Sequence, residues 1–256
     1  MHRVSSSEMC FVTLNEERMS FALKTSGEDV QTYVHLNVSK LFSDVVIESR
    51  ANNHIAFALG IANFSRALQS GKEASGVLLR LLKREGRSFL SLRAKTVDLD
   101  IIQNIPIEVV SMTTAENYRE PNVPPPTVAL EMPSLRSLRT ITDRLKVMQK
   151  YILLQAGMDG TLRLRVESDA FALQTLYTNL RSRADLVDDE NEDMDIPPTS
   201  TVRVDAKHIS KMLSVDGNAV MSVLCCLVDT QALVMHAILM EQFGSFTCYV
   251  PVVAME

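Results

Sequence analysis

The order in which strand-like and helix-like segments follow one another repeats along the 256 residues of this chain. Residues 54–95 and residues 201–239 each read as a strand, a short helix and two further strands. Apolar–polar alternation marks the strands, and apolar residues at spacings of three and four mark the helices. The two stretches share few identical residues, so the repeat indicates an old internal duplication. We therefore expect two domains of similar architecture, both rich in strands.

Two polar segments interrupt this pattern. Residues 111–127 hold four prolines in an otherwise polar run, which favours an extended connector that cannot join a central strand. We accordingly expect a first domain over residues 1–112, a connector over 113–126 and a second domain over 127–256. Residues 185–195 hold seven acidic residues and no basic one, which is typical of a solvated loop. The net charge of the chain is −5, so the remainder without this acidic loop is slightly basic.

The two halves begin differently. The second half starts with a strand at residues 127–132 and a long helix at 134–149, before its first hairpin, whereas the first half starts almost directly on its hairpin. By the logic of the repeat, a strand and a helix are missing from the N-terminal side, as in an incomplete gene model or an alternative start. We expect a first domain that is sticky and poorly stable when this chain is expressed alone.

The long helix combines an apolar side with a basic stripe. Pro133 suits a helix start, and Ser134 is a candidate cap. The stripe consists of Arg136, Arg139, Lys146 and Lys150, with Asp143 as its one acid. The two short helices add Lys207 and Lys211 in the second half and Arg66 and Lys72 in the first. One such stripe is usually an ordinary solvated surface. Positive faces on three helices, each backed by a sheet, are instead the pattern expected for phosphate contact.

The residues around these cations also indicate whether bases or the phosphate backbone would be contacted. No aromatic residue lies among these cations, so stacking on single-stranded bases is not indicated. No residue pattern suggests that base edges are read in a groove. We expect a sequence-neutral, salt-sensitive attraction to the backbone of double-stranded DNA.

Motifs for catalysis and metal binding are absent from the sequence. Phosphate-binding, dinucleotide-binding, nucleophile-elbow and zinc-protease patterns are not found, and the five histidines lack ligand spacing. Asp98 and Asp100 would share one strand face, which we interpret as a solvated pair. The four cysteines, Cys10, Cys225, Cys226 and Cys248, lie in apolar runs, so we expect reduced, buried thiols. We predict no enzyme, no cofactor and no metal.

Membrane and secretion signals are not evident either. The first residues lack the apolar region of a secretion signal. The longest uncharged apolar stretch, residues 217–228, is too short to span a bilayer. We expect a soluble intracellular protein with no membrane partner.

Almost the whole chain resembles a sliding DNA clamp subunit, and more closely the Hus-type subunit of the heterotrimeric DNA-damage checkpoint clamp. The order and length of five segments carry the resemblance: FSRALQSG (64–71), NIPIEVV (104–110), EPNVPPPTVALEMPSLRSL (120–138), MDGTLRLRVES (158–168) and TVRVDAKHISKML (201–213). The chain departs from the family pattern at the N-terminal strand and helix and at the acidic loop. The resemblance implies an α+β fold of two tandem sliding-clamp domains, with antiparallel sheets outside and helices lining a ring.

The resemblance also implies roles for particular residues. The residues expected to face DNA are Arg66, Lys72, Arg136, Arg139, Lys146, Lys150, Lys207 and Lys211. Two sheet-edge strands, residues 105–112 and 171–178, would pair with neighbouring subunits through Ile105, Ile107, Val109, Phe171, Leu173 and Leu176. Pro106 suits such an edge. A peptide-docking surface would lie beneath the connector.

The function implied is that of a non-enzymatic subunit that encircles double-stranded DNA at damage sites. Its partners would be two other checkpoint clamp subunits, a clamp loader, and checkpoint and repair proteins that dock at the connector. It would act in the nucleus and also be cytoplasmic before assembly. Two alternatives stay open: a homotrimeric replicative processivity clamp, and a sheet-rich enzyme such as a thioesterase-like hydrolase.

Overall fold

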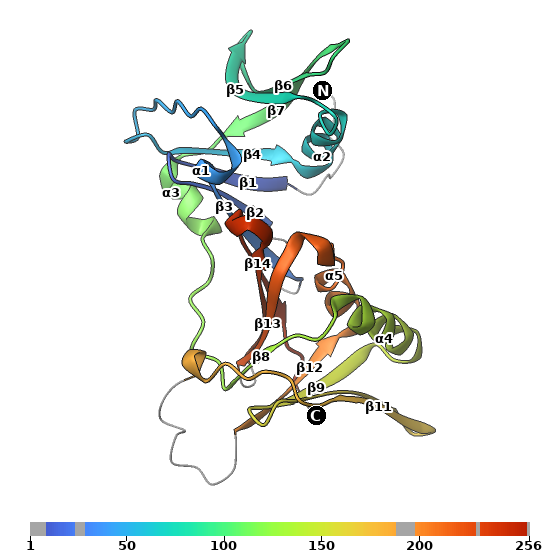
Figure 1. Cartoon of the computed structure of the whole chain (residues 1–256). Helices are drawn as coiled ribbons and strands as arrows, with labels where there is room; N and C mark the ends of the chain where they lie inside the picture. The colour runs from blue at the N-terminus through green and yellow to red at the C-terminus, as the bar shows by residue number, and fades with distance from the viewer. Residues whose placement is uncertain (1–8, 24–28, 188–197, 229–230, 255–256) are drawn as a thin grey trace. The chain divides into compact units, whose positions relative to one another are not determined.

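The computed structural model in Figure 1 describes residues 9–23, 29–187, 198–228 and 231–254. Contacts within the chain divide it into two compact units. Unit 1 comprises residues 1–24 and 35–120, and unit 2 comprises residues 25–34 and 121–256.

Unit 1 is an antiparallel sheet with one helix of more than two turns. Its elements are β1 (Met9–Leu14), β2 (Arg18–Leu23), β3 (Gln31–Asn37), α1 (Val38–Leu41), β4 (Ile55–Gly60), α2 (Ile61–Ser70), β5 (Gly76–Arg84), β6 (Arg87–Lys95) and β7 (Asp100–Val109). The strands lie in the order β5-β6-β7-β4-β1-β2. Residues 31–34 of β3 are counted with unit 2.

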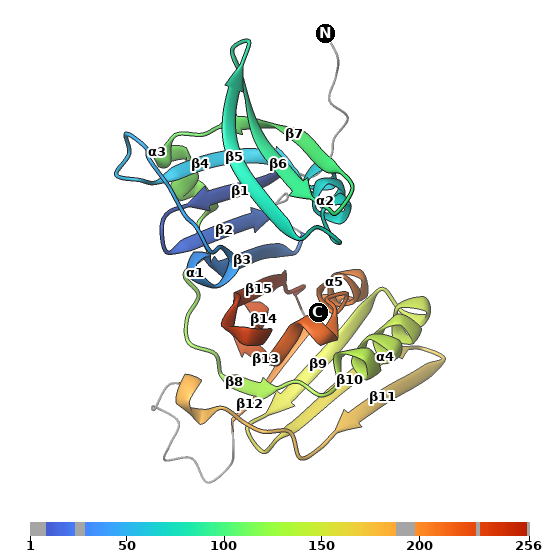
Figure 2. The same cartoon turned by 45° about the horizontal axis from the view of Figure 1, so that its top comes forward.

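Unit 2 consists of two sheets and two helices, α4 (Leu135–Met148) and α5 (Ala206–Met212). One sheet has the order β11-β10-β9-β12 and the other contains β15-β14-β13-β8. The strands are β8 (Val128–Glu131), β9 (Tyr151–Gly157), β10 (Thr161–Ser168), β11 (Phe171–Tyr177), β12 (Thr199–Asp205), β13 (Val220–Val228), β14 (Ala232–Leu239) and β15 (Gly244–Pro251). Short 3-10 turns lie at Ala184–Leu186, Gly217–Ala219 and Met240–Gln242. Figure 2 shows α4 lying across one face of the first sheet.

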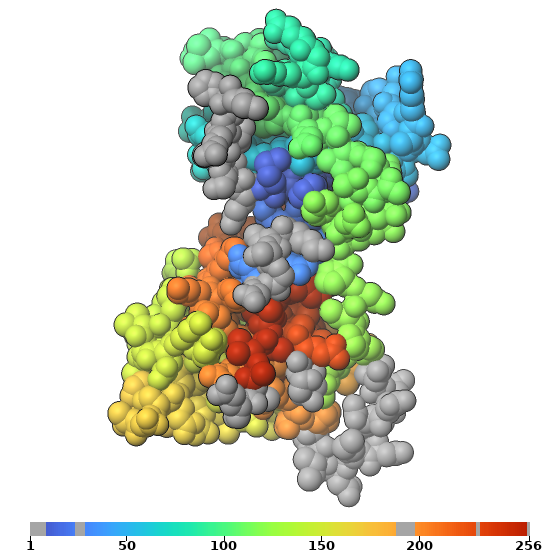
Figure 3. All heavy atoms as spheres, turned by 180° about the vertical axis from the view of Figure 1, so that it is seen from behind, coloured from blue at the N-terminus to red at the C-terminus, as the bar shows by residue number. Residues whose placement is uncertain are grey.

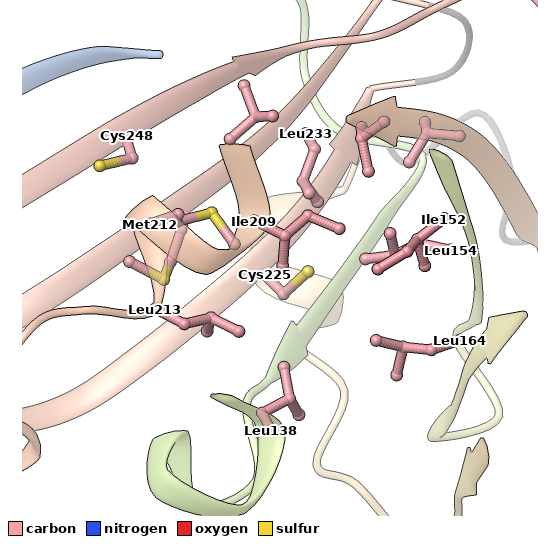
Figure 4. Close-up of a cluster of buried hydrophobic side chains, with 14 of the residues drawn as sticks. Leu138, Ile152, Leu154, Leu164, Ile209, Met212, Leu213, Cys225, Leu233 and Cys248 are labelled. Atoms are coloured by element: carbon pink, nitrogen blue, oxygen red, sulfur yellow. The ribbon is translucent and has the colours of Figure 1, made fainter. Parts of the chain in front are cut away.

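The core of unit 2 explains why its helices present only one side to solvent. Alternation along β9 turns Ile152 and Leu154 inward, where both are almost fully buried. Leu138 of α4 and Ile209 of α5 pack into the same cluster, as Figure 4 shows. Burial of each such side chain contributes about 1.5–3 kcal/mol relative to exposure. This apolar attachment leaves the polar sides of α4 and α5 outward.

Several local predictions are confirmed. The helices expected near residues 134–149, 61–71 and 207–214 are α4, α2 and α5. The hairpin expected at Asp159-Gly160 joins β9 and β10, and Gly160 has φ +82°. A Cβ atom at Gly160 would overlap with the Leu180 carbonyl oxygen. Glycine is therefore required there by both the backbone angle and the space.

The repeated order of elements is present, and it exposes a difference between the units. The order β4-α2-β5-β6 in unit 1 matches β12-α5-β13-β14 in unit 2. In unit 2, β8 pairs with β13, and α4 packs beside α5. Among the described residues of unit 1, no strand lies beyond β5 and no helix packs along α2. Val77, Leu78 and Leu81 on the β5 edge are consequently exposed.

The connector is extended only in its second part. Met112, expected to end the preceding strand, and residues 113–118, expected to be irregular, form α3 (Met112–Ala115) and the turn η1 (Glu116–Tyr118). The Ser111 hydroxyl accepts a hydrogen bond from the Thr114 N–H over 3.1 Å and so caps α3. Tyr118 stacks on Phe11 of β1, which ties this part to unit 1. Figure 3 shows the connector, in green, at the molecular surface.

Three smaller expectations need correction or fall outside the described residues. The Ser134 side chain makes no capping hydrogen bond. Asp98 lies in a bend before β7, whereas Asp100 is in the strand and pairs with Arg93, so the two do not share a strand face. Asp185 of the acidic loop forms a double hydrogen bond with Arg183. Residues 188–195 of that loop lie outside the described residues.

Candidate nucleic-acid and subunit interfaces

A polar network around Asp143 joins the outward sides of α4 and α5. Lys146 Nζ lies 3.1 Å from Asp143 Oδ1 and donates to Ser210 Oγ over 3.0 Å. The Ser210 hydroxyl donates to the same carboxylate oxygen over 2.8 Å, and Arg139 Nε lies 3.8 Å from the other. The Ser210 hydrogen bond, followed by that of Lys146, holds the pKa of Asp143 below its usual value. The carboxylate is therefore ionised at neutral pH and offsets part of the surrounding positive charge.

Arg136 and Lys207 are less constrained. Neither forms a salt bridge with any described residue. Arg136 and Arg139 line a groove of about 900 Å³ between α4 and residues 213–223. Lys207 is exposed one turn before Lys211 on α5. These two cations can exchange water for an anion without first breaking an ion pair.

Lys211 has a partner that sequence reasoning missed. Its ammonium group lies 3.5 Å from Asp29 Oδ2, and His208 Nε2 lies 3.6 Å from Asp29 Oδ1. Asp29 belongs to the residue 25–34 segment of unit 2, 182 positions away from Lys211. No local pattern could have indicated this pairing. The positive charge of Lys211 is thus partly neutralised.

Lys150 does not continue the basic stripe of α4. The helix ends at Met148, and the backbone of Gln149 is extended. The Lys150 ammonium lies 4.8 Å from the centroid of the Tyr151 ring. Tyr151 alternates with the inward-facing Ile152, so it lies on the sheet face away from α4. A cation over an aromatic face is attracted by the ring quadrupole, which explains the change of direction.

The cations of unit 1 lie on or just after α2. Arg66 donates to the Asn63 side chain over 2.9 Å. Lys72 follows the helix C-terminus and borders an apolar surface that includes Phe64 and Leu68. Arg66 and Lys72 are described within unit 1 only.

β11 has the properties expected of a subunit-pairing strand. It lies at the edge of its sheet, because β10 is its one neighbour in the described strands. Phe171, Leu173 and Leu176 are 36%, 42% and 48% exposed. Exposed apolar side chains on a strand with one unpaired edge mark a surface that can accept another strand.

β7 is an edge strand over only part of its length. Residues 100–107 pair with β6, and residues 107–109 also pair with β4. Ile105 is buried in the core of unit 1, Ile107 is partly buried, and Val109 is exposed. The strand ends at Val109, and Met112, predicted to lie in it, belongs to α3. On the side that faces β4, the free edge therefore precedes Ile107 rather than extending to residue 112.

His35 of β3 contacts Glu120, which follows the helical part of the connector. His35 Nε2 lies 3.1 Å from Glu120 Oε2, and His35 Nδ1 lies 2.9 Å from Ser20 Oγ. Together with the Tyr118–Phe11 stack, these contacts attach residues 112–120 to the strands of unit 1.

The described residues contain no group of three or more His, Cys, Asp or Glu side chains arranged to hold a metal ion. Among the same residues, no helix is both long and apolar enough to cross a membrane. The four cysteines are free thiols, three buried and Cys226 half-buried.

Comparison with known proteins decides the family. The family model described as Hus1-like protein matches residues 4–254. The chain belongs to the Hus1-like family. It is 29% identical over 240 residues to checkpoint protein hus1 of Schizosaccharomyces pombe, covering 89% of this chain and 83% of that protein. It is 21% identical over 254 residues to checkpoint protein HUS1 of Homo sapiens, covering 96% and 90%.

The fold comparison agrees with the family. The crystal structure of PCNA from Thermococcus kodakaraensis matches with a TM-score of 0.67 at 16% identity, over 96% of this chain and 91% of that one. At this identity the match shows the fold alone, so this Hus1-like chain has the sliding-clamp fold predicted from its sequence. The checkpoint relatives favour a DNA-damage checkpoint clamp subunit over a homotrimeric replicative clamp.

Proposed function

We propose that this Hus1-like chain is a non-enzymatic subunit of a heterotrimeric checkpoint clamp that encircles double-stranded DNA. The observation that carries the proposal is the side-by-side arrangement of α4 and α5, joined by the Lys146–Ser210 hydrogen bond, with cations on their outward sides. Two sheet-backed helices with basic outward sides suit contact with phosphates rather than with bases. Many weak, similar phosphate contacts let a closed ring slide, because each register along the duplex has nearly the same energy.

The proposed DNA-facing residues are those of the sequence prediction except Lys150. Arg136 and Lys207 would contribute most, because neither forms an ion pair with a described residue. Arg139, Lys146 and Lys211 would contribute less, since Asp143 and Asp29 partly neutralise them. Arg66 and Lys72 would add contacts from unit 1.

Ring closure would use the strand edges. β11 would pair with one neighbouring subunit and the free part of β7, before Ile107, with another. A clamp loader would then place the ring on DNA in the nucleus, and checkpoint and repair proteins would bind at the connector. The free chain would be cytoplasmic before assembly.

The proposal is tested with the ring assembled from this chain and the two other subunits and loaded onto closed circular or linear duplex. The double variant Arg136→Glu/Lys207→Glu should be released from circular DNA at lower salt than wild type. Arg84→Glu/Arg87→Glu, at the β5–β6 turn, changes the charge equally and serves as the matched control. Equal retention of both double variants, or equal retention of wild type on circular and linear DNA, would refute the proposal.

A further inference from the structure

The face of the β11-β10-β9-β12 sheet that points away from α4 and α5 carries its own group of cations. Side chains alternate along these strands, so Ile152 and Leu154 of β9 point to the core, and Tyr151, Leu153 and Gln155 point outward. On β10, Leu162 and Leu164 are buried, whereas Arg163 and Arg165 are half-buried on the outer side. On β12, Val202 and Val204 are buried and Arg203 faces outward.

Strand register brings two of these arginines close together. Leu153 of β9 lies opposite Arg165 of β10 and opposite Arg203 of β12. Neighbouring strands are about 4.8 Å apart, so the two arginine Cα atoms lie about 10 Å apart across Leu153. Two arginine side chains at this separation can reach the same anion above the Leu153 side chain, whose apolar surface forms the floor between them.

The guanidinium groups on this face are held in place by neighbours. Arg203 lies 4.6 Å from the Tyr151 ring centroid and donates to the Ala254 carbonyl over 3.4 Å. Arg165 Nη2 lies 2.8 Å from Glu167 Oε2. Each guanidinium has five N–H donors, so these contacts fix its position and leave donors available. Because these side chains are already ordered, the entropic cost of fixing them when a ligand binds is lower.

Charge on this face is positive although the chain is acidic overall. Among the described residues, Lys150, Arg163, Arg165 and Arg203 are accompanied by three carboxylates, Asp159, Glu167 and Asp205. Asp205 also accepts the capping hydrogen bond from the Lys207 N–H of α5. The chain as a whole has a net charge of −5. The excess of cations is therefore a local property of this sheet face.

We propose that this outer face is a docking surface for a phosphorylated acidic peptide of a partner protein, with one phosphate held between Arg165 and Arg203. Arginine suits this role because its planar donors match phosphate oxygens in pairs. Charge complementarity favours an anionic ligand. A peptide is favoured over single-stranded nucleic acid, because the Tyr151 ring is not open for base stacking. Lys150 and Arg203 already lie against Tyr151, whereas a stacking platform needs an open ring face. The surface lies on the opposite side of the sheet from the proposed duplex contacts.

The test uses a fluorescein-labelled peptide of Ser, Asp and Glu in which one serine is phosphorylated, together with its unphosphorylated twin, in fluorescence anisotropy titrations of the full chain. The phosphopeptide should bind at least tenfold more tightly than its twin. Arg165→Ala/Arg203→Ala should weaken it about tenfold or more, because both sets of guanidinium donors to the phosphate are lost. Arg80→Ala/Arg84→Ala on β5 removes the same charge elsewhere and should leave binding unchanged.

The remaining outcomes separate this proposal from its rivals. Arg165→Lys/Arg203→Lys keeps the charge but loses paired donors, and should give intermediate affinity with wild-type thermal stability. Salt-dependent retention of the assembled ring on circular duplex should be unchanged in the alanine pair, so the two proposals can fail separately. Equal losses in both alanine pairs, equal binding of the two peptides, or full displacement by single-stranded oligonucleotide at lower concentration than by phosphopeptide would overturn it.

Discussion

Lys146 on α4 donates to the hydroxyl of Ser210 on α5 over 3.0 Å, and that hydroxyl donates back to Asp143 of α4, so two hydrogen bonds join the helices at their proposed DNA surface. Asp143 accepts from both groups and lies in the middle of the basic stripe. The carboxylate thus orders the cations around it and at the same time reduces the positive potential that a phosphate would meet. These two effects have opposite consequences for DNA contact, and their sizes can be compared.

Replacing Asp143 with asparagine should strengthen DNA contact. The Asp143 side chain is 42% exposed, so the ordering of its neighbours is worth about 0.5 kcal/mol or less. Removal of a negative charge acts on every nearby phosphate, so we expect a threefold or greater gain in affinity at low salt, on the order of the effect of one added cation. Retention of the assembled ring on circular duplex as salt rises measures this. Weaker retention than wild type would show that ordering dominates.

Asp143 should also make the thermal stability of the protein depend on pH in the acid range. Asp143 has a folded-state pKa below the ordinary value of 3.8, so its contribution is fully present above that value and is lost as pH falls through the lowered folded pKa. Asp143→Asn should melt slightly below wild type near neutral pH, and the difference should shrink as pH falls below 3.8 and vanish once the carboxyl is protonated in the folded protein. Melting curves by circular dichroism across this range provide the measurement. A difference that persists at the acid end would contradict the assignment.

The exposed edge of β5 should cause self-association of the chain when it is purified alone. Val77, Leu78 and Leu81 are exposed on a strand whose outer side has no partner in the described residues, and such edges pair with other chains. Leu81→Glu should reduce association in light scattering without lowering the melting temperature. Val46→Glu, at a more exposed loop position, is the control. Equal association of wild type and Leu81→Glu would exclude the edge as the cause.

The thiols should be unreactive in the folded protein. Burial raises the pKa of Cys10, Cys226 and Cys248 to about 11 and raises that of Cys225 further. With a pKa of about 11, about one thiol in a thousand is ionised at pH 8, and the thiolate is the reactive form. A colorimetric thiol reagent should therefore detect all four cysteines only after denaturant is added. One fast-reacting equivalent in the native protein would identify a thiol that is more accessible than the structure indicates.

Sequence patterns were reliable where local periodicity decides the structure. The apolar spacing of Leu135, Leu138 and Leu145 gave α4 to within one residue at each end, because packing on a sheet requires that period. The Asp159-Gly160 turn was recognised because few residues accept its backbone angles. The family resemblance supplied the clamp fold, which periodicity alone does not specify.

The predictions were wrong where contacts between residues far apart in the sequence determine the structure. Lys150 was placed on the α4 stripe by extending the helical period past Met148, where the helix has ended and Tyr151 attracts the cation. The pairing of Lys211 with Asp29 spans 182 positions and has no local signal. The helical start of the connector did have a local sequence signal, because Ser111 is a suitable N-cap for α3. The prolines later in the connector led instead to the prediction of an extended segment. β7 pairs with β4 as its second neighbour, and no local sequence pattern indicates this pairing.

The central claim, that this chain is one of three different subunits in a ring, is tested most directly by its native mass after co-expression with the two other checkpoint clamp subunits. A heterotrimeric ring requires a single complex with one copy of each chain, and Leu173→Lys/Leu176→Lys on β11 should prevent its formation while the variant chain stays folded. A ring of three copies of this chain, or a chain that enters no complex with the other two, would contradict it.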